Sequence, residues 1–286
     1  MTFTDGATKK SLFIQVGSYD PNLLAKHLDH VYEAHKDPTM DDYIFNVVLN
    51  EIGEDGELHP NMDTILRYLP GEEKQAFQNV FIGSHVVRLP GKWITDIEYR
   101  WANLREQKAL WQAAMRYRSN RPWHYYIDHE GVLDFFSRWR YKRAIEAFLI
   151  QSCRDAFFVQ PNRAILWSPY WDNPPTWLAK HNLKQVFNNL PRYAPQGINW
   201  LHLQDTVGAR FGQTKEQAVE WFRVLDDIYD WDSLRMNMDY FVRTSGGLAP
   251  ADPLEVQARE NWYEQQGIPV GASWELRWWM DNHKEL

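Results

Sequence analysis

The chain has 286 residues, a formal net charge of −7 and 44% hydrophobic residues. That length and composition provide for a large core and exclude an intrinsically disordered chain. Lys and Arg are scattered rather than clustered, so nucleic acid is not an expected partner, because phosphate binding needs grouped cations.

One cysteine, Cys153, excludes an internal disulfide bond and a zinc site built from several cysteines. It lies in a helix-like run and is expected to be a buried, unreactive thiol. The first residues lack the apolar centre of a signal peptide, and no apolar run reaches membrane-spanning length, so no membrane partner is expected. Localisation and oligomeric state stay open, and an extracellular or phage-associated protein is compatible with these patterns.

Strand-like apolar runs recur along the chain and alternate with helix-like segments. Eight such runs can be identified, at residues 11–17, 43–52, 80–89, 123–128, 164–171, 198–205, 234–242 and 269–276. Asp20-Pro21 and Asp252-Pro253 each predict a helix start, with a capping residue followed by proline at the first helical position. Thr214 opens the sequence TKEQ, which predicts a capping box for the helix after the sixth run.

Eight strand–helix units in series predict an α/β fold, a (β/α)8 TIM barrel in which residues 1–286 form a single domain. No linker-like stretch divides the chain. An open doubly wound sheet is the alternative, but GSYDPN after the first run is not the glycine-rich phosphate fingerprint GxGxxG. A nucleotide-dependent oxidoreductase is therefore disfavoured, and no cofactor is expected.

Carboxylates follow most of the strand-like runs, at the barrel end where active sites are built. Asp128 and Glu130 are two residues apart, so both point the same way on an extended backbone. Two close carboxylates push their pKa values apart and keep one protonated as a general acid. Glycoside hydrolysis needs such an acid and a second carboxylate, for which Asp205 is the first choice and Asp239 the second.

Aromatic side chains are unusually abundant, with 15 Trp, 14 Tyr and 14 Phe. Most are expected in the core, but rings near strand ends also suit the stacking of a sugar. The expected partner is a polysaccharide or oligosaccharide substrate. The side chains predicted to bind it are Glu51, His85, Tyr170, Trp171, His202, Gln204, Tyr240, Trp274 and Glu275.

The segments ILWSPYW and LHLQDTVGA, with the acidic end of the fourth run, resemble glycoside hydrolase-like barrels of poorly characterised bacterial and phage families. More distantly the chain resembles the spherulin-4 type, which cleaves amino-sugar polymers. The resemblance implies that Asp128 and Glu130 match the acidic strand-four position and that Asp205 matches a strand-six site residue. The largest retaining clan instead has Asn-Glu after strand four and Glu after strand seven, so the roles of nucleophile and base stay open.

Two other functions use the same barrel. A metal-dependent hydrolase would draw on His85, His129, His202, Asp205 and Asp239. No His-x-His ends the first run and no HExxH occurs, so no metal is expected. A non-catalytic carbohydrate-binding barrel would keep the aromatic rings but would not need paired acids.

Overall fold

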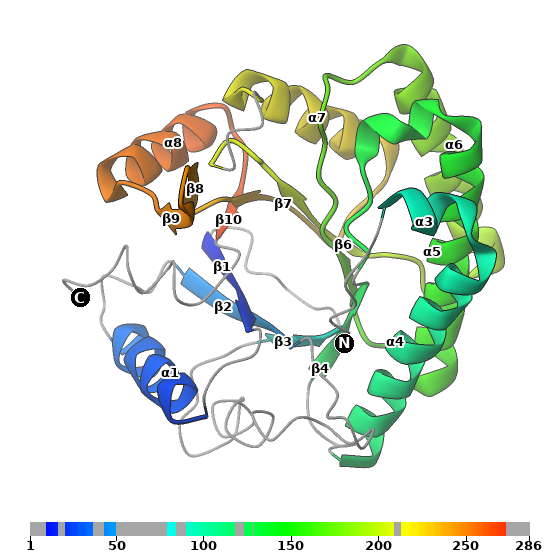
Figure 1. The fold of residues 1–286 in the computed structure, drawn as a ribbon, viewed down its shortest axis with the longest axis horizontal. Coiled ribbons are helices and arrows are strands. Elements are labelled where there is room, and N and C mark those ends of the chain that lie inside the picture. The colour runs from blue at the N-terminus through cyan, green and yellow to red at the C-terminus, as the bar shows by residue number, and fades with distance from the viewer. Residues whose placement is uncertain are drawn as a thin grey trace.

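Eight parallel strands close into a barrel, and helices surround it (Figure 1). The computed structural model describes residues 10–16, 21–36, 43–49, 79–83, 90–117, 123–127, 129–208 and 213–272. The barrel strands are β1 (Lys10–Val16), β2 (Tyr43–Leu49), β3 (Asn79–Ile82), β4 (Trp123–Ile127), β5 (Ile165–Trp167), β6 (Trp200–Gln204), β7 (Ser233–Met238) and β10 (Val270–Ala272). Each pairs with the next in this order, and β10 pairs with β1. The predicted (β/α)8 fold is confirmed.

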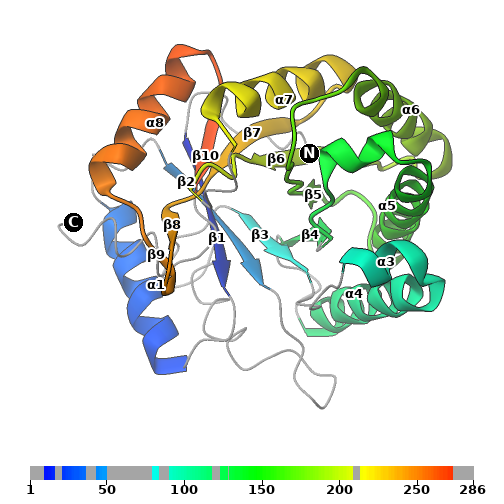
Figure 2. The same cartoon turned by 45° about the horizontal axis from the view of Figure 1, so that its top comes forward.

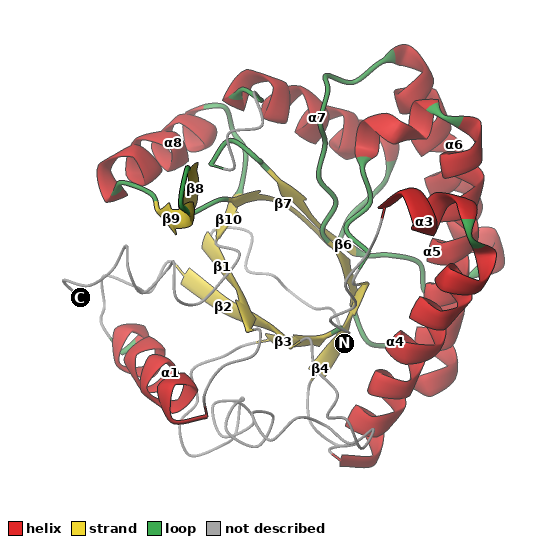
Figure 3. Cartoon of the chain, viewed as in Figure 1, coloured by secondary structure: helices red, strands yellow, loops and turns green. Residues whose placement is uncertain are grey.

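The helices form the outer layer, drawn in red around the yellow strands in Figure 3. They are α1 (Pro21–His35), α3 (Pro90–Thr95), α4 (Ile97–Tyr117), α5 (Trp139–Val159), α6 (Trp177–Tyr193), α7 (Lys215–Ile228) and α8 (Pro253–Gln265), with a short 3-10 helix η2 (Leu133–Ser137) before α5. None of the helices in the described residues combines the length and apolar character needed to cross a bilayer.

Two predicted strands have different extents in the structure. The run 234–242 divides into β7 and a separate strand β8 (Phe241–Thr244), which pairs antiparallel with β9 (Gly247–Pro250) beside α8 (Figure 2). The run 164–171 contributes β5 and, after Pro169, which lacks an N–H, an isolated parallel bridge between Tyr170 and Val132.

The predicted helix starts that can be compared with the structure are confirmed. The Thr214 side chain accepts the Gln217 N–H at 3.3 Å, and the Gln217 side chain accepts the Thr214 N–H at 3.0 Å. Asp252 accepts the Leu254 N–H at 2.9 Å in front of α8. Asp20 lies outside the described residues, and α1 begins at Pro21.

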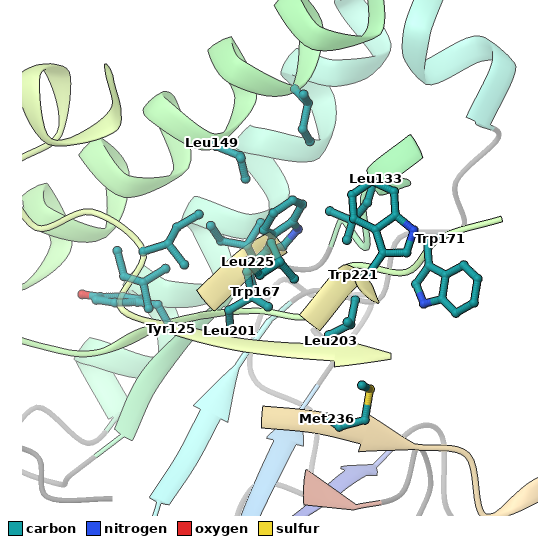
Figure 4. Packing of buried hydrophobic residues seen from close by; sticks show 14 of the residues in the cluster. Tyr125, Leu133, Leu149, Trp167, Trp171, Leu201, Leu203, Trp221, Leu225 and Met236 are labelled. Carbon is teal, nitrogen blue, oxygen red and sulfur yellow. The ribbon is translucent and has the colours of Figure 1, made fainter. Parts of the chain in front are cut away.

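The outer core lies between the strands and the helix layer. Figure 4 shows Trp167, Leu201 and Leu203 on this side, packed together with side chains from the helices. Cys153 of α5 is fully buried in the same cluster, and burial raises the pKa of its thiol. The thiol is therefore protonated and inert, as predicted.

A second, smaller aromatic cluster fills the inside of the barrel. The ring centroids of Phe81 on β3 and Trp200 on β6 are 5.1 Å apart. These strands are not neighbours in the sheet, so the contact crosses the barrel interior. Phe81 also lies 5.2 Å from His124, and Tyr126 and Leu166 complete the packing. Because side chains alternate along a strand, these residues identify the inward-facing positions of β4, β5 and β6.

Two imidazoles are buried within this interior in their neutral form. His124 accepts the Ala164 N–H through Nδ1 at 3.2 Å, which requires that nitrogen to be unprotonated. Burial, with Arg163 nearby, lowers its pKa to about 3. Burial, with Arg235 nearby, likewise lowers the pKa of His202 to about 3.

Acidification is therefore expected to destabilise the barrel well above the range where carboxylates titrate. The unfolded chain takes up protons near the usual histidine pKa, whereas the folded chain does not until about pH 3, so stability falls as pH drops through this window. Between about pH 7.5 and about pH 5.5 the unfolding free energy should fall by about 1.4 kcal/mol per histidine. Urea titrations across this range test the slope, and His202→Gln should remove about half of it.

Candidate active site

The C-terminal ends of β4 to β7 form the described part of the barrel mouth. Glu130, Tyr170, Gln204 and Asp239 lie on these strand exits or within the last residues of the strands. Five of the predicted site residues fall outside the described residues: Glu51, His85, Asp128, Trp274 and Glu275. Their placement and roles stay predictions.

Hydrogen bonds to main-chain carbonyls fasten the ends of β5 and β6. Gln204 donates through Nε2 to the Ser168 carbonyl at 3.0 Å, and the Ser168 hydroxyl donates to the His202 carbonyl at 2.8 Å. His202 has no exposed surface and its ring stacks near Trp200, at a centroid distance of 6.1 Å. His202 therefore belongs to the barrel interior, and Gln204 stands at the boundary between that interior and the mouth.

His129, which follows β4, points away from the barrel axis toward the helix layer. His129 stacks on Trp93 of α3 with ring centroids 3.8 Å apart and planes 5° apart. Its carbonyl accepts the Trp167 indole N–H at 2.7 Å. The chain turns at the neighbouring Glu130, where the Gly131 N–H donates to the His129 carbonyl at 2.9 Å, and the Glu130 carboxylate is close enough to Tyr170 to raise the pKa of its hydroxyl. His129 is therefore a packing residue on the helix side, where it does not serve the metal site considered above.

Glu130 and Tyr170 bring the exits of β4 and β5 together. The Tyr170 N–H donates to the Gly131 carbonyl at 3.0 Å, and the Leu133 N–H donates to the Tyr170 carbonyl at 2.8 Å. Burial raises the pKa of Tyr170 to about 12, and the carboxylates of Asp172 and Glu130 add to the shift. Both Glu130 and Tyr170 keep part of their surface exposed, so both are accessible to a ligand.

Asp205 occupies a different environment from the one predicted. Side chains alternate along β6, so Asp205 points outward in the same way as Leu201 and Leu203. Its carboxylate has no exposed surface. Both carboxylate oxygens of Asp205 accept hydrogen bonds. Oδ1 accepts the N–H groups of Val207 at 3.3 Å and Asp239 at 3.2 Å.

The other oxygen of Asp205 faces α8. Oδ2 accepts the Tyr263 hydroxyl at 3.4 Å and lies 3.5 Å from Nε of Arg259. Arg259 also donates through Nη2 to the Asp239 carbonyl. Asp205 and Asp239, the two predicted partner acids, are therefore neighbours, and Asp205 and Arg259 hold the Asp239 main chain from both sides.

Burial dominates the electrostatics of this cluster. It raises the pKa of Asp205 above the usual value, and Arg259 and the two backbone N–H groups oppose the rise without cancelling it. Burial and the neighbouring carboxylate raise the pKa of Tyr263 well above 10.0, so its hydroxyl stays a proton donor. The cluster is suited to holding the mouth in shape.

The backbone after Asp205 is tightly packed. Thr206 has φ 56°, in the left-handed region that few side chains adopt, and its hydroxyl donates to the Asp205 carbonyl at 2.8 Å. A Cβ on Gly208 would lie 2.3 Å from the Phe241 carbonyl oxygen. Gly208 thus allows the backbone after Asp205 to approach the Phe241 carbonyl closely.

The predicted sugar-stacking rings divide into one accessible and two buried side chains. Tyr170 is partly exposed. Trp171 has no exposed surface and lies near Leu133 and Trp221 (Figure 4), and Tyr240 is 2% exposed in the same core. Stacking on a sugar needs an open ring face, so the placement of Trp171 and Tyr240 does not support their predicted binding role.

Other tryptophans with large exposed fractions lie on the helix layer. In the described part of the chain Trp101, Trp139 and Trp177 are 42%, 64% and 75% exposed, on α4, α5 and α6. A groove of about 430 Å³ runs beside Trp101 between α4 and α5. No carboxylate lines it, so it offers no acid–base chemistry.

Three residues around the mouth are not among the predicted site residues: Asn237, Arg259 and Tyr263. Asn237 faces inward from β7 and is paired with Gln204 in the sheet register. Its alternation with Met236 and Met238 was a usable signal. Arg259 and Tyr263 lie on α8, and no local pattern marks them as partners of Asp205. Among the described residues no three His, Cys, Asp or Glu side chains gather in a metal-binding group.

Comparison with known proteins defines the fold class further. No protein-family model and no curated protein matches the sequence. Solved structures do match: an α-L-fucosidase-like protein from Bacteroides thetaiotaomicron has a TM-score of 0.63 at 11% identity, over 94% of this chain and 87% of its own.

Two further structures share the barrel. An intracellular xylanase from Thermoanaerobacterium saccharolyticum matches with a TM-score of 0.52 at 12% identity, over 96% of this chain and 88% of its own. The PgaB (BpsB) glycoside hydrolase domain from Bordetella bronchiseptica matches with a TM-score of 0.50 at 10% identity, over 97% of this chain and 96% of its own. At these identities the likeness establishes a shared (β/α)8 fold.

The Asp205–Arg259 pair provides a stability test. Asp205→Asn removes the carboxylate with the larger electrostatic effect on the buried Arg259 guanidinium, on which Asp239 also acts, and should lower the unfolding free energy by about 3–5 kcal/mol. Combining it with Arg259→Met should cost less than the sum of the single changes, measured by urea denaturation.

A matched control uses an exposed ion pair. Lys180 and Glu220 lie 3.5 Å apart, with side chains 41% and 50% exposed, so Glu220→Gln should change stability by at most about 1 kcal/mol. Strict additivity of the Asp205 and Arg259 substitutions would show that the two side chains do not interact.

Proposed function

We propose that the protein is a glycoside hydrolase that cleaves a polysaccharide or oligosaccharide at the C-terminal mouth of a single-domain barrel spanning residues 1–286. The observation that carries this proposal is the presence of two acids at strand exits, the partly exposed Glu130 after β4 and Asp239 after β7, which is 2% exposed, above an interior filled with side chains. Two carboxylates across a sugar are the chemical requirement for this reaction. The fold shared with solved glycosidases supports it.

The acids take complementary roles in the proposal. Glu130, or Asp128 beside it in the sequence, donates a proton to the leaving oxygen. Asp239 activates water or attacks the anomeric carbon, and the carboxyl separation decides between the two: about 5 Å for retention and about 6.5–9.5 Å for inversion. Asp205, predicted as the partner acid, contributes mainly by holding the Asp239 main chain.

The substrate class follows from charge and accessible rings. The acidic mouth repels strongly anionic polymers, so neutral or cationic glycans are favoured. Tyr170 is the accessible ring for stacking. Suitable candidates are α-L-fucosides, xylan and partly deacetylated amino-sugar polymers, the last in keeping with the predicted resemblance to the spherulin-4 type.

Release of reducing ends from these three substrates tests the proposal. Glu130→Gln and Asp239→Asn should each lower the rate about 100-fold or more, because each removes a proton-transfer or nucleophilic group. Asp128→Asn tests the alternative acid. Glu220→Gln, on the outer surface of α7, should retain full activity.

Three other results would redirect the assignment. Glycan binding without cleavage indicates a carbohydrate-binding barrel. Activity that depends on an added divalent metal indicates the metal-dependent hydrolase. Cleavage that survives both acid substitutions, with the fold intact by circular dichroism, excludes Glu130 and Asp239 as the catalytic pair.

A further inference from the structure

The groove between α4 and α5 is an apolar hollow on the outer surface of the helix layer. It has a volume of about 430 Å³ and runs along residues 144–154 of α5, a rise of about 15 Å. Ile97, Trp101 and Tyr193 in its walls are 56%, 42% and 52% exposed, so an apolar ligand that covers them removes this surface from water. The apolar walls include Ile97, Trp101, Leu104, Ala147, Phe148 and Tyr193.

The floor of the groove is fixed by contacts with α3 and with the exit of β4. Arg100 donates through Nη1 to the Trp93 and Ile94 carbonyls at 2.8 Å and 2.9 Å. Phe148 packs edge-on against Trp93, with ring centroids 5.4 Å apart, and against His129, with ring centroids 5.6 Å apart. The groove is therefore formed in the absence of a ligand, as small-molecule sites usually are.

The charged residues that line the groove are cationic. The chain has a net charge of −7, yet Arg100 and Arg154 line the groove and, among the described residues, no Asp or Glu does. Arg154 is exposed, and its Nε donates to the Tyr193 carbonyl at 2.8 Å. This bond holds the guanidinium at one end of the groove and leaves its Nη groups available to an anion. The adjacent Asp155 is paired with Lys108 at 2.7 Å.

We propose that the groove binds a small apolar molecule with one carboxylate, of the medium-chain fatty acid class, whose chain lies along α5 and whose carboxylate bonds Arg154. The volume lies within the range of small-molecule sites, about 300–1,000 Å³. Eleven residues line the groove, whereas one side of a stable protein interface takes about 20–30. A guanidinium forms charge-assisted hydrogen bonds to a carboxylate and so fixes the direction of the ligand. The inference goes beyond the proposed function, because the groove is separate from the mouth.

Calorimetry with decanoate and decan-1-ol tests the inference, since the two probes share a chain length and only decanoate is charged. The wild type should bind one decanoate per chain and should bind decan-1-ol about 10-fold more weakly. Arg154→Gln should weaken decanoate binding about 10-fold and leave decan-1-ol binding unchanged. Arg143→Gln is the matched control: Arg143 is also an exposed arginine of α5, it lies outside the groove, and its loss should alter neither affinity.

A second variant tests the location of the site. Ala147 is exposed in the wall of the groove, so Ala147→Phe fills the groove without changing the core. It should weaken the binding of both probes about 10-fold or more, with the circular dichroism spectrum and the melting temperature of the wild type retained.

Four results overturn the inference. The wild type shows no saturable decanoate binding. Arg154→Gln and Arg143→Gln weaken decanoate binding equally, which makes the effect one of net charge. Ala147→Phe binds decanoate as the wild type does, which places the probe elsewhere. The wild type self-associates in sedimentation experiments, binds neither probe and becomes monomeric on Ala147→Phe, which assigns the groove to a contact between two copies of the chain.

Discussion

The burial of the Asp205 carboxylate is the interaction on which the rest of the mouth depends. It gathers two backbone N–H groups, a tyrosine hydroxyl and a guanidinium from the exits of β6 and β7 and from α8. An ionised group without exposed surface is costly unless it is surrounded in this way. The geometry of Asp239 is consequently set by α8, a helix that follows it in the chain and lies outside the barrel.

The buried aromatic residues form two separate packing layers. One set packs the outer faces of the strands against the helices, and the smaller set around Phe81 and Trp200 fills the barrel from inside. The second set ends where Gln204 and Asn237 begin. The polar mouth is therefore a thin layer, supported from below by rings that meet across the barrel, and this support is what holds a small number of polar groups in fixed positions.

Much of the fold could be predicted from the sequence, because apolar runs and helix caps are local signals. Thr214 and Asp252 cap their helices as their spacing indicates. The direction of the Asp205 side chain could not be predicted in the same way, since it depends on which alternate residues of β6 face the barrel interior. That orientation becomes visible only through the contact between Phe81 and Trp200. The pairing of Asp205 with Arg259 joins residues far apart in the chain, which no local pattern records. The burial of Trp171 likewise depends on a core cluster that includes Trp221, a residue distant in the sequence.

The aromatic plug inside the barrel has a consequence for what can pass along the barrel axis. Phe81, Tyr126 and Trp200 meet inside the barrel and close it below the mouth. A polymer cannot thread through it end to end. A long chain bound at this face would lie across the rim and would leave by the same face. Passage along the barrel axis is thereby excluded by packing alone.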